Sequence, residues 1–177
     1  MVYPELNDVL CWINHNYQDY NLPSRDLDKT DYAILENLQR QGRISNVDLA
    51  KAVHLSPSPC LERVRRLESE GFIESYVARL NPKKLHLGMS AFIQVTLDRT
   101  TGDVFDNFKN SLSSISEVAE CHMVAGGFDY LVKLRVRDME AYRDVLGRLV
   151  ELPGVAQTHT YVVIEQVKHD EGLILKS

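Results

Sequence analysis

The chain of 177 residues has few cysteines and no long apolar run. Its three cysteines, Cys11, Cys60 and Cys121, are scattered and form no C-x-x-C pair. This scarcity argues against a disulfide framework or a zinc site and is typical of a protein in a reducing cytoplasm. No apolar segment approaches the roughly 20 residues that a membrane helix needs. The start lacks a basic region followed by an apolar core, so we expect neither a signal peptide nor a membrane partner.

The sequence also lacks the spacings that mark catalytic sites. Six histidines are present, but none lies in an H-E-x-x-H pattern or beside a nucleophile signature. His122 and His159 fall in expected strands, where a packed or solvent-facing imidazole is the simpler interpretation. Gly126-Gly127 is too short for a phosphate-binding loop. We therefore predict no enzyme activity, no metal and no cofactor.

Charge is distributed unevenly along the chain. The net charge is -5, yet residues 27–83 hold nine Lys/Arg and eight Asp/Glu, so this part is slightly positive. The sign suits contact with nucleic acid, although the excess is small. One such domain should bind DNA weakly, because affinity grows with the number of phosphates neutralised. Tight binding would need several linked copies.

Residues 43–72 predict two short helices joined by a tight corner. Ser45 suits the N-cap of the first helix, since its hydroxyl can accept an unpaired amide of the first turn. Ser56 suits the N-cap of the second helix, and Pro57 suits its first position, where no amide partner is needed. Gly71 suits the C-terminal end. A helix pair of this kind is typical of a helix-turn-helix, whose second helix enters the DNA major groove.

The second helix would place Cys60, Leu61, Val64 and Leu67 on its apolar side. We expect the opposite, polar side to reach bases or phosphates. Together with polar residues of the two helix starts, the predicted DNA-binding residues are Ser45, Asn46, Ser56, Ser58, Pro59, Glu62, Arg63 and Arg66. An ordinary amphipathic helix with a solvated charged face remains the alternative.

Flanking segments complete the first half. Residues 27–41 predict a preceding helix capped by Asp28, with Asp31 at the third position. Residues 72–80 are expected to be extended, as a small wing or a connecting strand. Residues 1–26 are expected to form a weakly ordered arm or a short helix.

The second half alternates strand and helix patterns in the order βαββαβ, a ferredoxin-like arrangement. Right-handed crossovers would put both helices on one face of the sheet. The other face, expected to carry Phe92, Met123 or Tyr161, would then be bare. Another copy of the chain is the simplest cover, so we predict a homo-oligomer.

Several segments closely resemble one protein family. L-S-P-S-P-C-L-E-R-V-R-R-L-E-S-E-G-F-I, E-C-H-M-V-A-G-G-F-D-Y, D-M-E-A-Y-R, L-P-G-V and T-Y-V-V-I-E occur in this order. Together they are similar to the Lrp/AsnC (feast/famine) regulators over residues 27–176. The resemblance implies an α+β fold: a winged helix-turn-helix over residues 27–80, a linker over 81–88, and a ferredoxin-like (RAM-type) effector and oligomerisation domain over 89–177.

Family resemblance also implies an amino-acid effector bound between dimers, which assemble into tetramers or octamers. The turn Gly126-Gly127-Phe128-Asp129-Tyr130 matches the family's effector loop, where backbone amides would bind the carboxylate and Asp129 the ammonium group. On the residues alone, a glycine hairpin followed by Asp is an ordinary turn. Positions matching leucine-response determinants are Met123, Asp129, Met139, Tyr161, Val162 and Val163. Leucine-responsive members have Asp at the position of Gly127, so the identity of the effector stays open.

We therefore expect a transcription regulator of amino-acid metabolism genes that binds double-stranded DNA and responds to leucine or alanine. The main alternative is a nucleoid-type, DNA-organising protein without a ligand response. Two others are a small enzyme built on the βαββαβ half and a module that only assembles.

Overall fold

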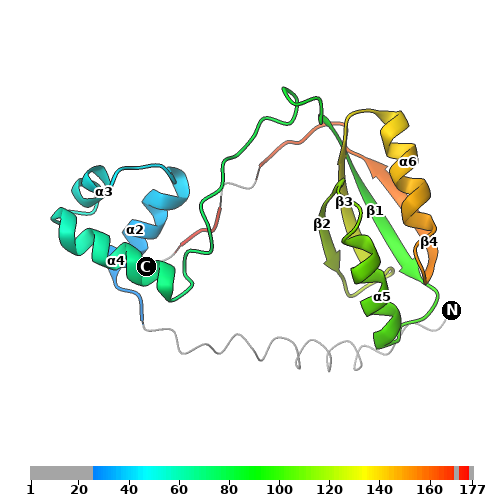
Figure 1. Cartoon of the computed structure of the whole chain (residues 1–177), viewed down its shortest axis with the longest axis horizontal. Coiled ribbons are helices and arrows are strands. Elements are labelled where there is room, and N and C mark those ends of the chain that lie inside the picture. Colours follow the sequence, from blue (N-terminus) through cyan, green and yellow to red (C-terminus); the bar gives the residue numbers. More distant parts are fainter. Residues whose placement is uncertain (1–25, 170–171, 176–177) are drawn as a thin grey trace. The chain divides into compact units, whose positions relative to one another are not determined.

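The computed structural model describes residues 26–169 and 172–175 (Figure 1). The predicted N-terminal arm, apart from Asp26, lies outside the described residues. The described chain divides into two compact units. One holds the residues up to Arg79 together with the segment from Lys168 onward, and the other holds residues 80–167. The C-terminal segment thus groups with the first unit, which differs from the expected domain of residues 89–177.

In its described residues, the first unit contains three helices: α2 (Lys29–Arg40), α3 (Asn46–Ala52) and α4 (Pro57–Ser69). The predicted cap of α2 is confirmed as a full capping box. The Asp31 amide donates to Asp28 Oδ1 at 2.8 Å, and the Asp28 amide donates to Asp31 Oδ2 at 3.2 Å. Two otherwise unpaired amides are satisfied in this way, so the start of α2 is well defined.

The other predicted helix ends also have a local cause. The Asp48 amide donates to Ser45 Oγ at 3.1 Å, which caps α3. Pro57 begins α4, although the Ser56 side chain makes no capping hydrogen bond. Gly71 ends this helix with a φ of 78°, a left-handed conformation that glycine adopts without steric cost. The apolar sides of the three helices meet in a small core of Ile34, Leu49, Ala50, Val53, Cys60 and Leu67.

His54 lies in the corner between α3 and α4 and has a φ of 56°. Its amide donates to the Lys51 carbonyl, and the Leu55 amide donates to the Ala50 carbonyl at 2.8 Å, which is a Schellman arrangement. We expect His54→Gly to stabilise this unit by about 1 kcal/mol, because a left-handed non-glycine residue carries about that strain. Thermal unfolding of the two chains checks this, and an unchanged or lower melting temperature for His54→Gly would contradict it.

The segment after α4 differs from the expected wing strand. Residues 72–88, all of which the structure describes, contain no strand. Tyr76 instead folds back on α4, where its hydroxyl bonds Glu68 at 3.0 Å. A turn follows at the expected boundary, with the Leu87 amide donating to the Pro82 carbonyl at 2.8 Å. The wing position is therefore occupied by an irregular segment.

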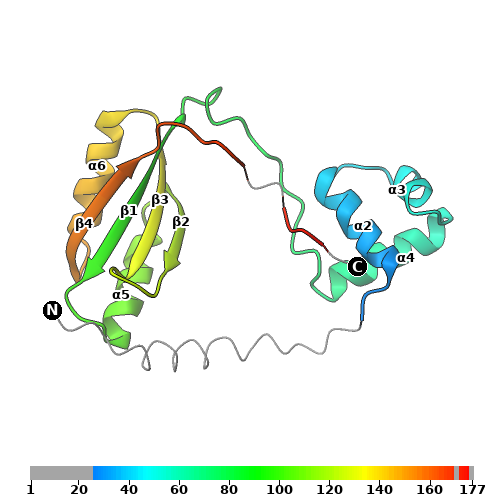
Figure 2. The same cartoon turned by 180° about the vertical axis from the view of Figure 1, so that it is seen from behind.

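The second unit confirms the βαββαβ order. Its elements are β1 (Met89–Leu97), α5 (Gly102–Leu112), β2 (Val118–Met123), β3 (Tyr130–Val136), α6 (Met139–Val150) and β4 (Val155–Val162). The sheet is antiparallel throughout, with the strand order β2-β3-β1-β4. Figure 1 shows α5 and α6 on the same side of this sheet, and Figure 2 shows the uncovered face from behind.

Strict alternation along the central strands explains the two faces. In β1, Ala91, Ile93, Val95 and Leu97 are buried under the helices, and β3 repeats the pattern. Phe92 lies on the open face opposite Tyr161 of β4. Met123 pairs with Tyr130 and packs against the helix-side core. The expectation that Met123 lies on the bare face is therefore wrong, because the register of β2 turns this side chain toward the helices.

Candidate functional site

The exposed side of α4 carries Arg65 in place of the predicted Arg63 and Arg66. Residues of a helix advance by about 100° each, so Ser58, Glu62, Arg65 and Ser69 project away from buried Cys60. All four are exposed. The predicted Ser58 and Glu62 therefore have the accessibility that base contact requires. Arg65 was missed, although this angular position could have identified it from the sequence.

Arg63 and Arg66, which we expected to face DNA, point instead to the start of α2. Arg63 Nη1 lies 2.6 Å from Asp28 Oδ2 and 2.8 Å from Asp31 Oδ1. Arg66 Nη2 lies 2.7 Å from Asp31 Oδ2. Asp31 is only 1% exposed, and among the described residues of this unit it is the charged residue that is buried. Both arginines are therefore engaged within the unit, where two cations face the two carboxylates of Asp28 and Asp31. The sequence did not predict these ion pairs, and contact of Arg63 and Arg66 with DNA stays a prediction.

These ion pairs have electrostatic consequences at both partners. The hydrogen bond from Arg63 lowers the pKa of Asp28 below its usual value, and the Asp31 amide lowers it further. The same contacts raise the pKa of Arg63. We name Asp28, Asp31, Arg63 and Arg66 the α2–α4 clamp. It joins the start of α2 to the middle of α4 and thereby holds the orientation of α4.

The remaining predicted DNA residues lie near the starts of α3 and α4. Ser56 and Pro59 are exposed. Ser45 is exposed as well, but its hydroxyl is engaged as the cap of α3 and donates to Asp48 Oδ2 at 2.6 Å. Asn46 Nδ2 donates to the Pro57 carbonyl at 2.8 Å and so links the two helix starts. Ser45 and Asn46 therefore shape the corner between the helices.

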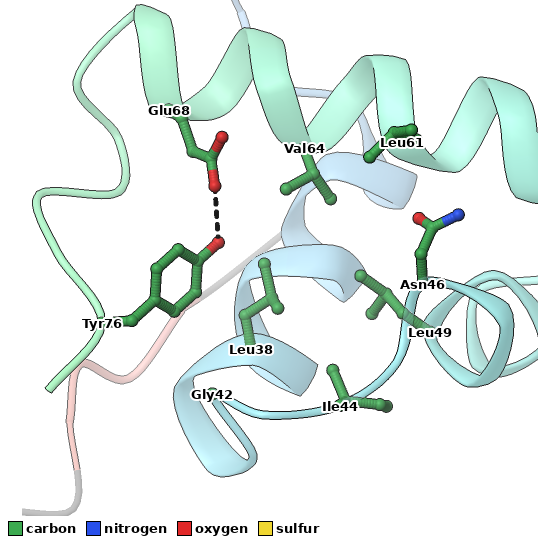
Figure 3. A pocket seen from close by; sticks show the side chains of 9 residues that line it. All are labelled: Leu38, Gly42, Ile44, Asn46, Leu49, Leu61, Val64, Glu68 and Tyr76. Carbon is green, nitrogen blue, oxygen red and sulfur yellow. Dashed lines mark hydrogen bonds between the residues drawn. The ribbon is translucent and has the colours of Figure 1, made fainter. Parts of the chain in front are cut away.

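A mostly apolar pocket lies beside this corner (Figure 3). Its lining side chains come from the end of α2, from α3, from α4 and from the segment after α4. Figure 3 shows the Glu68–Tyr76 hydrogen bond at one edge and Asn46 at the other. Burial, with help from Glu68, raises the pKa of Tyr76 to about 12, so its hydroxyl stays protonated and keeps this bond. The pocket thus marks where the irregular segment closes against the helices.

The loop between β2 and β3 holds the predicted effector glycines. Neither Gly126 nor Gly127 has a positive φ, and a Cβ at either position would meet no atom of the chain within 4 Å. The backbone conformation and internal packing therefore do not require glycine here. The small size of these two glycines matters only for a group that approaches the loop from outside, such as a ligand or another subunit.

Asp129 is already partly used by the fold. Its Oδ2 accepts the Leu97 amide at 2.7 Å, and its own amide donates to the Val95 carbonyl at 3.0 Å. The Val124 amide donates to the Asp129 carbonyl at 2.9 Å, which closes the loop. None of these loop hydrogen bonds uses Asp129 Oδ1. This second carboxylate oxygen could therefore accept a hydrogen bond from an ammonium group.

Phe128 is half-buried, whereas Tyr130 is 2% exposed and packs against Phe105 and Phe108. Burial raises the pKa of Tyr130 to about 12. The Tyr130 side chain faces the helix-side core, so an effector in the loop could reach this residue only through its backbone.

The other predicted effector residues lie at the opposite end of the sheet. Tyr130 pairs with Val95 of β1, whereas Val162 pairs with Ala91, four residues away. At about 3.3 Å per residue the two ends are at least about 13 Å apart. Met139, at the start of α6, is 50% exposed near the Val162 end, and Tyr161 and Val163 flank Val162. Within one chain, Met123 lies at the same end of the sheet as the glycine loop. Met139, Tyr161, Val162 and Val163 lie at the other end, so one chain does not bring all the predicted effector residues together.

Neither a membrane span nor a metal site is found in the described residues. No helix there is long and apolar enough to cross a bilayer. No group of three or more potential metal ligands occurs in that part of the chain. Among the described cysteines, Cys60 is a buried core residue and Cys121 is exposed.

Comparison with known proteins covers both units. Residues 27–74 match the family model described as winged helix-turn-helix DNA-binding, and residues 90–173 match the Lrp/AsnC ligand binding domain. The leucine-responsive regulatory protein of Escherichia coli (strain K12) is 53% identical over 156 residues, which are 88% of this chain and 95% of that protein.

Solved structures agree. A transcriptional regulator from Neisseria meningitidis in complex with L-Met is 40% identical, with a TM-score of 0.78, over 81% of this chain and 94% of that one. The feast or famine regulatory protein from M. tuberculosis complexed with L-methionine is 32% identical, with a TM-score of 0.77, over 85% of this chain and 100% of that one. These relatives are regulators rather than enzymes, and the predicted α+β fold with its two domains is confirmed. With both domains matched in order and more than half of the aligned residues identical, this chain belongs to the Lrp/AsnC family.

Proposed function

We propose that this protein is a sequence-specific, DNA-binding regulator of amino-acid metabolism genes that responds to a small amino acid. The observation that carries the DNA part is the exposed face of α4, where Ser58, Glu62 and Arg65 are free of the core. The width of a major groove admits one such helix, and serine, glutamate and arginine all pair with base edges. A regulator of transcription acts beside the chromosome, so we place it in the cytoplasm.

A nucleoid-type protein without a ligand is the alternative, and no comparison supports it. Two solved relatives are complexes with L-methionine. Methionine therefore joins leucine and alanine as a first candidate effector. A thermal-shift screen against the twenty amino acids tests this, because a ligand of the folded state raises the melting temperature. A screen in which none of them shifts unfolding or DNA affinity would favour the alternative.

Dimerisation through the open sheet face is part of the proposal. Phe92 pairs with Tyr161, which is 56% exposed, and Leu131 pairs with the next open-face residue of β1, Gln94. Lys133 Nζ bonds Glu120 Oε1 at 2.6 Å and lies 5.9 Å from the Phe92 ring centre. Apolar side chains framed by a satisfied ion pair are typical of a surface that a second subunit covers. Further pairing of dimers would give the tetramer or octamer that the family resemblance implies.

Phe92→Glu is expected to convert the assembled protein into monomers or to lower its association constant by more than tenfold. A carboxylate would be buried at the centre of the interface, where the neighbouring Lys133 is already paired with Glu120. Light scattering after size exclusion measures the mass. Asn107→Glu, which adds the same charge on exposed α5, is the matched control and should leave the mass unchanged. Equal masses for both variants would remove the open face as the interface.

The effector would use groups from both ends of the sheet. Because the glycine loop and the Met139–Val162 end lie apart within one chain, we propose that a second subunit brings them together. Free amides at Gly126 and Gly127 would bind the carboxylate, and Asp129 Oδ1 would bind the ammonium group. Val162, Val163 and Met139 would offer an apolar slot, since unbranched methionine adapts to different side chains. Gly127 adds no side chain to the site, so the amides of the loop stay open to an approaching carboxylate.

Asp129→Asn is expected to weaken amino-acid binding by at least tenfold while leaving the melting temperature of the free protein nearly unchanged. Asparagine keeps an oxygen for the Leu97 amide but removes the charge that would hold an ammonium group. Asp129→Ala is a poorer test, because it leaves that amide without its acceptor and costs about 1–3 kcal/mol. Isothermal titration with leucine, alanine and methionine measures the affinity. Undiminished affinity in Asp129→Asn would place the ammonium group elsewhere.

A further inference from the structure

A contact far apart in sequence joins the C-terminal segment to α2. Gln39 Nε2 donates to the Leu173 carbonyl at 2.8 Å, and the Leu173 amide donates to Gln39 Oε1 at 2.9 Å. One side-chain amide thus satisfies both main-chain groups of one residue, as a neighbouring strand would. Gln39 therefore bonds the backbone of Leu173, whose side chain is largely exposed.

The contact with Gln39 requires glycine at position 172. Its φ is 103°, a conformation that other residues rarely adopt. A Cβ at this position would lie 2.4 Å from Gln39 Cδ and 2.6 Å from Gln39 Cγ. Both the backbone angle and the close approach therefore require glycine. Gly126, Gly127 and Gly102, in contrast, have open space around the same added atom.

We propose that residues 172–175 are a docking segment for α2, so that the DNA-binding unit is connected to the effector unit twice. The first connection is the segment after α4, and the second is the C-terminal segment that follows β4. The connecting residues 163–171 reach about 30 Å when extended. Since the two hydrogen bonds are exposed, docking depends on this covalent attachment, which raises the local concentration of the segment.

This second connection gives the proposed effector site a route to DNA, and that part rests on the proposed function. The connection begins at Val163, whose amide donates to the Ser90 carbonyl at 2.9 Å. Val162 and Val163 are also candidate effector residues. A ligand that contacts them acts where the connection starts, and the other end holds the first unit at Gln39. An amino acid can shift DNA affinity in this way only if it binds the docked and undocked forms differently.

Hydrogen exchange of the full chain tests the docking. The variants are Gln39→Ala, which removes both hydrogen bonds and keeps a good helix former, and Gly172→Val, which blocks the close approach. Asn107→Ala and Gly102→Val are the matched controls on exposed positions of α5. We expect the C-terminal peptide, read by mass spectrometry, to exchange at least tenfold faster in both test variants and at the wild-type rate in both controls. Equal exchange in all five proteins overturns the proposal.

DNA affinity with and without leucine, alanine and methionine tests the coupling. The ratio of the two affinities should fall at least threefold in Gln39→Ala and Gly172→Val. A lost contact with an unchanged ratio overturns the coupling. If the wild type itself shows no response, the proposed function fails, but the exchange experiment still decides the docking. Protection that disappears on dilution would assign the segment to a second copy and overturn the same-chain contact.

Discussion

Asp31→Ala is expected to destabilise the DNA-binding unit by about 3 kcal/mol. Breaking a buried ion pair by removing one partner costs about 3–5 kcal/mol, because the other charge is left uncompensated. Here both Arg63 and Arg66 lose their shared carboxylate, and the lower end applies because each arginine is 29% exposed and keeps some hydration. The capping box of α2 loses a member as well.

Urea unfolding followed by circular dichroism measures this loss, since the first unit is helical and the second contains the sheet. Asp28→Ala is the matched control. Its side chain is 52% exposed, so its removal should cost only about 1 kcal/mol. A midpoint for Asp31→Ala equal to that of the wild type would show that the clamp contributes nothing to stability.

Arg65→Ala is expected to lower operator affinity by about 5- to 150-fold without changing stability. A bidentate arginine–guanine contact is worth about 1–3 kcal/mol. If Arg65 contacts a phosphate instead, affinity falls evenly across sequences and the salt slope drops by about one. Because Arg65 is exposed and its angular position is opposite the core, its removal leaves the packing of α4 intact.

Fluorescence anisotropy on an operator selected from random duplexes, at several salt concentrations, measures this effect. Arg63→Ala is the informative comparison, since it should lose stability through the α2–α4 clamp. Its DNA affinity, measured at a temperature where it stays folded, should change less than that of Arg65→Ala. The reverse order of the two affinities would restore Arg63 as the groove contact.

Local features of this chain were predictable from the sequence because their causes are local. Asp28 and Asp31 lie three residues apart, and that spacing is enough to form the capping box of α2. Alternation in β1 and β3 follows from the two-residue period of a strand, so the buried and open faces were correctly separated there. Family resemblance, carried by motifs in order, supplied the fold and the two domains.

Other features depended on which segments meet. Whether Arg63 binds DNA or a carboxylate depends on where α2 packs, and only the folded unit placed Asp31 under α4. The register of β2 against β3 turned Met123 to the helix side, although this residue lies beside the effector loop in sequence.

The sequence by itself determined helix ends and the two faces of β1 and β3, because these rest on residues within a few positions of one another. It also determined the family, through motifs that occur in order along the chain. Tertiary structure alone decided that Met139 and Gly126 lie at opposite ends of one sheet and that Gln39 meets Leu173. These relations join residues far apart in the chain. Hydrophobic periodicity and capping patterns describe only neighbouring residues, so they do not predict how close such distant residues lie.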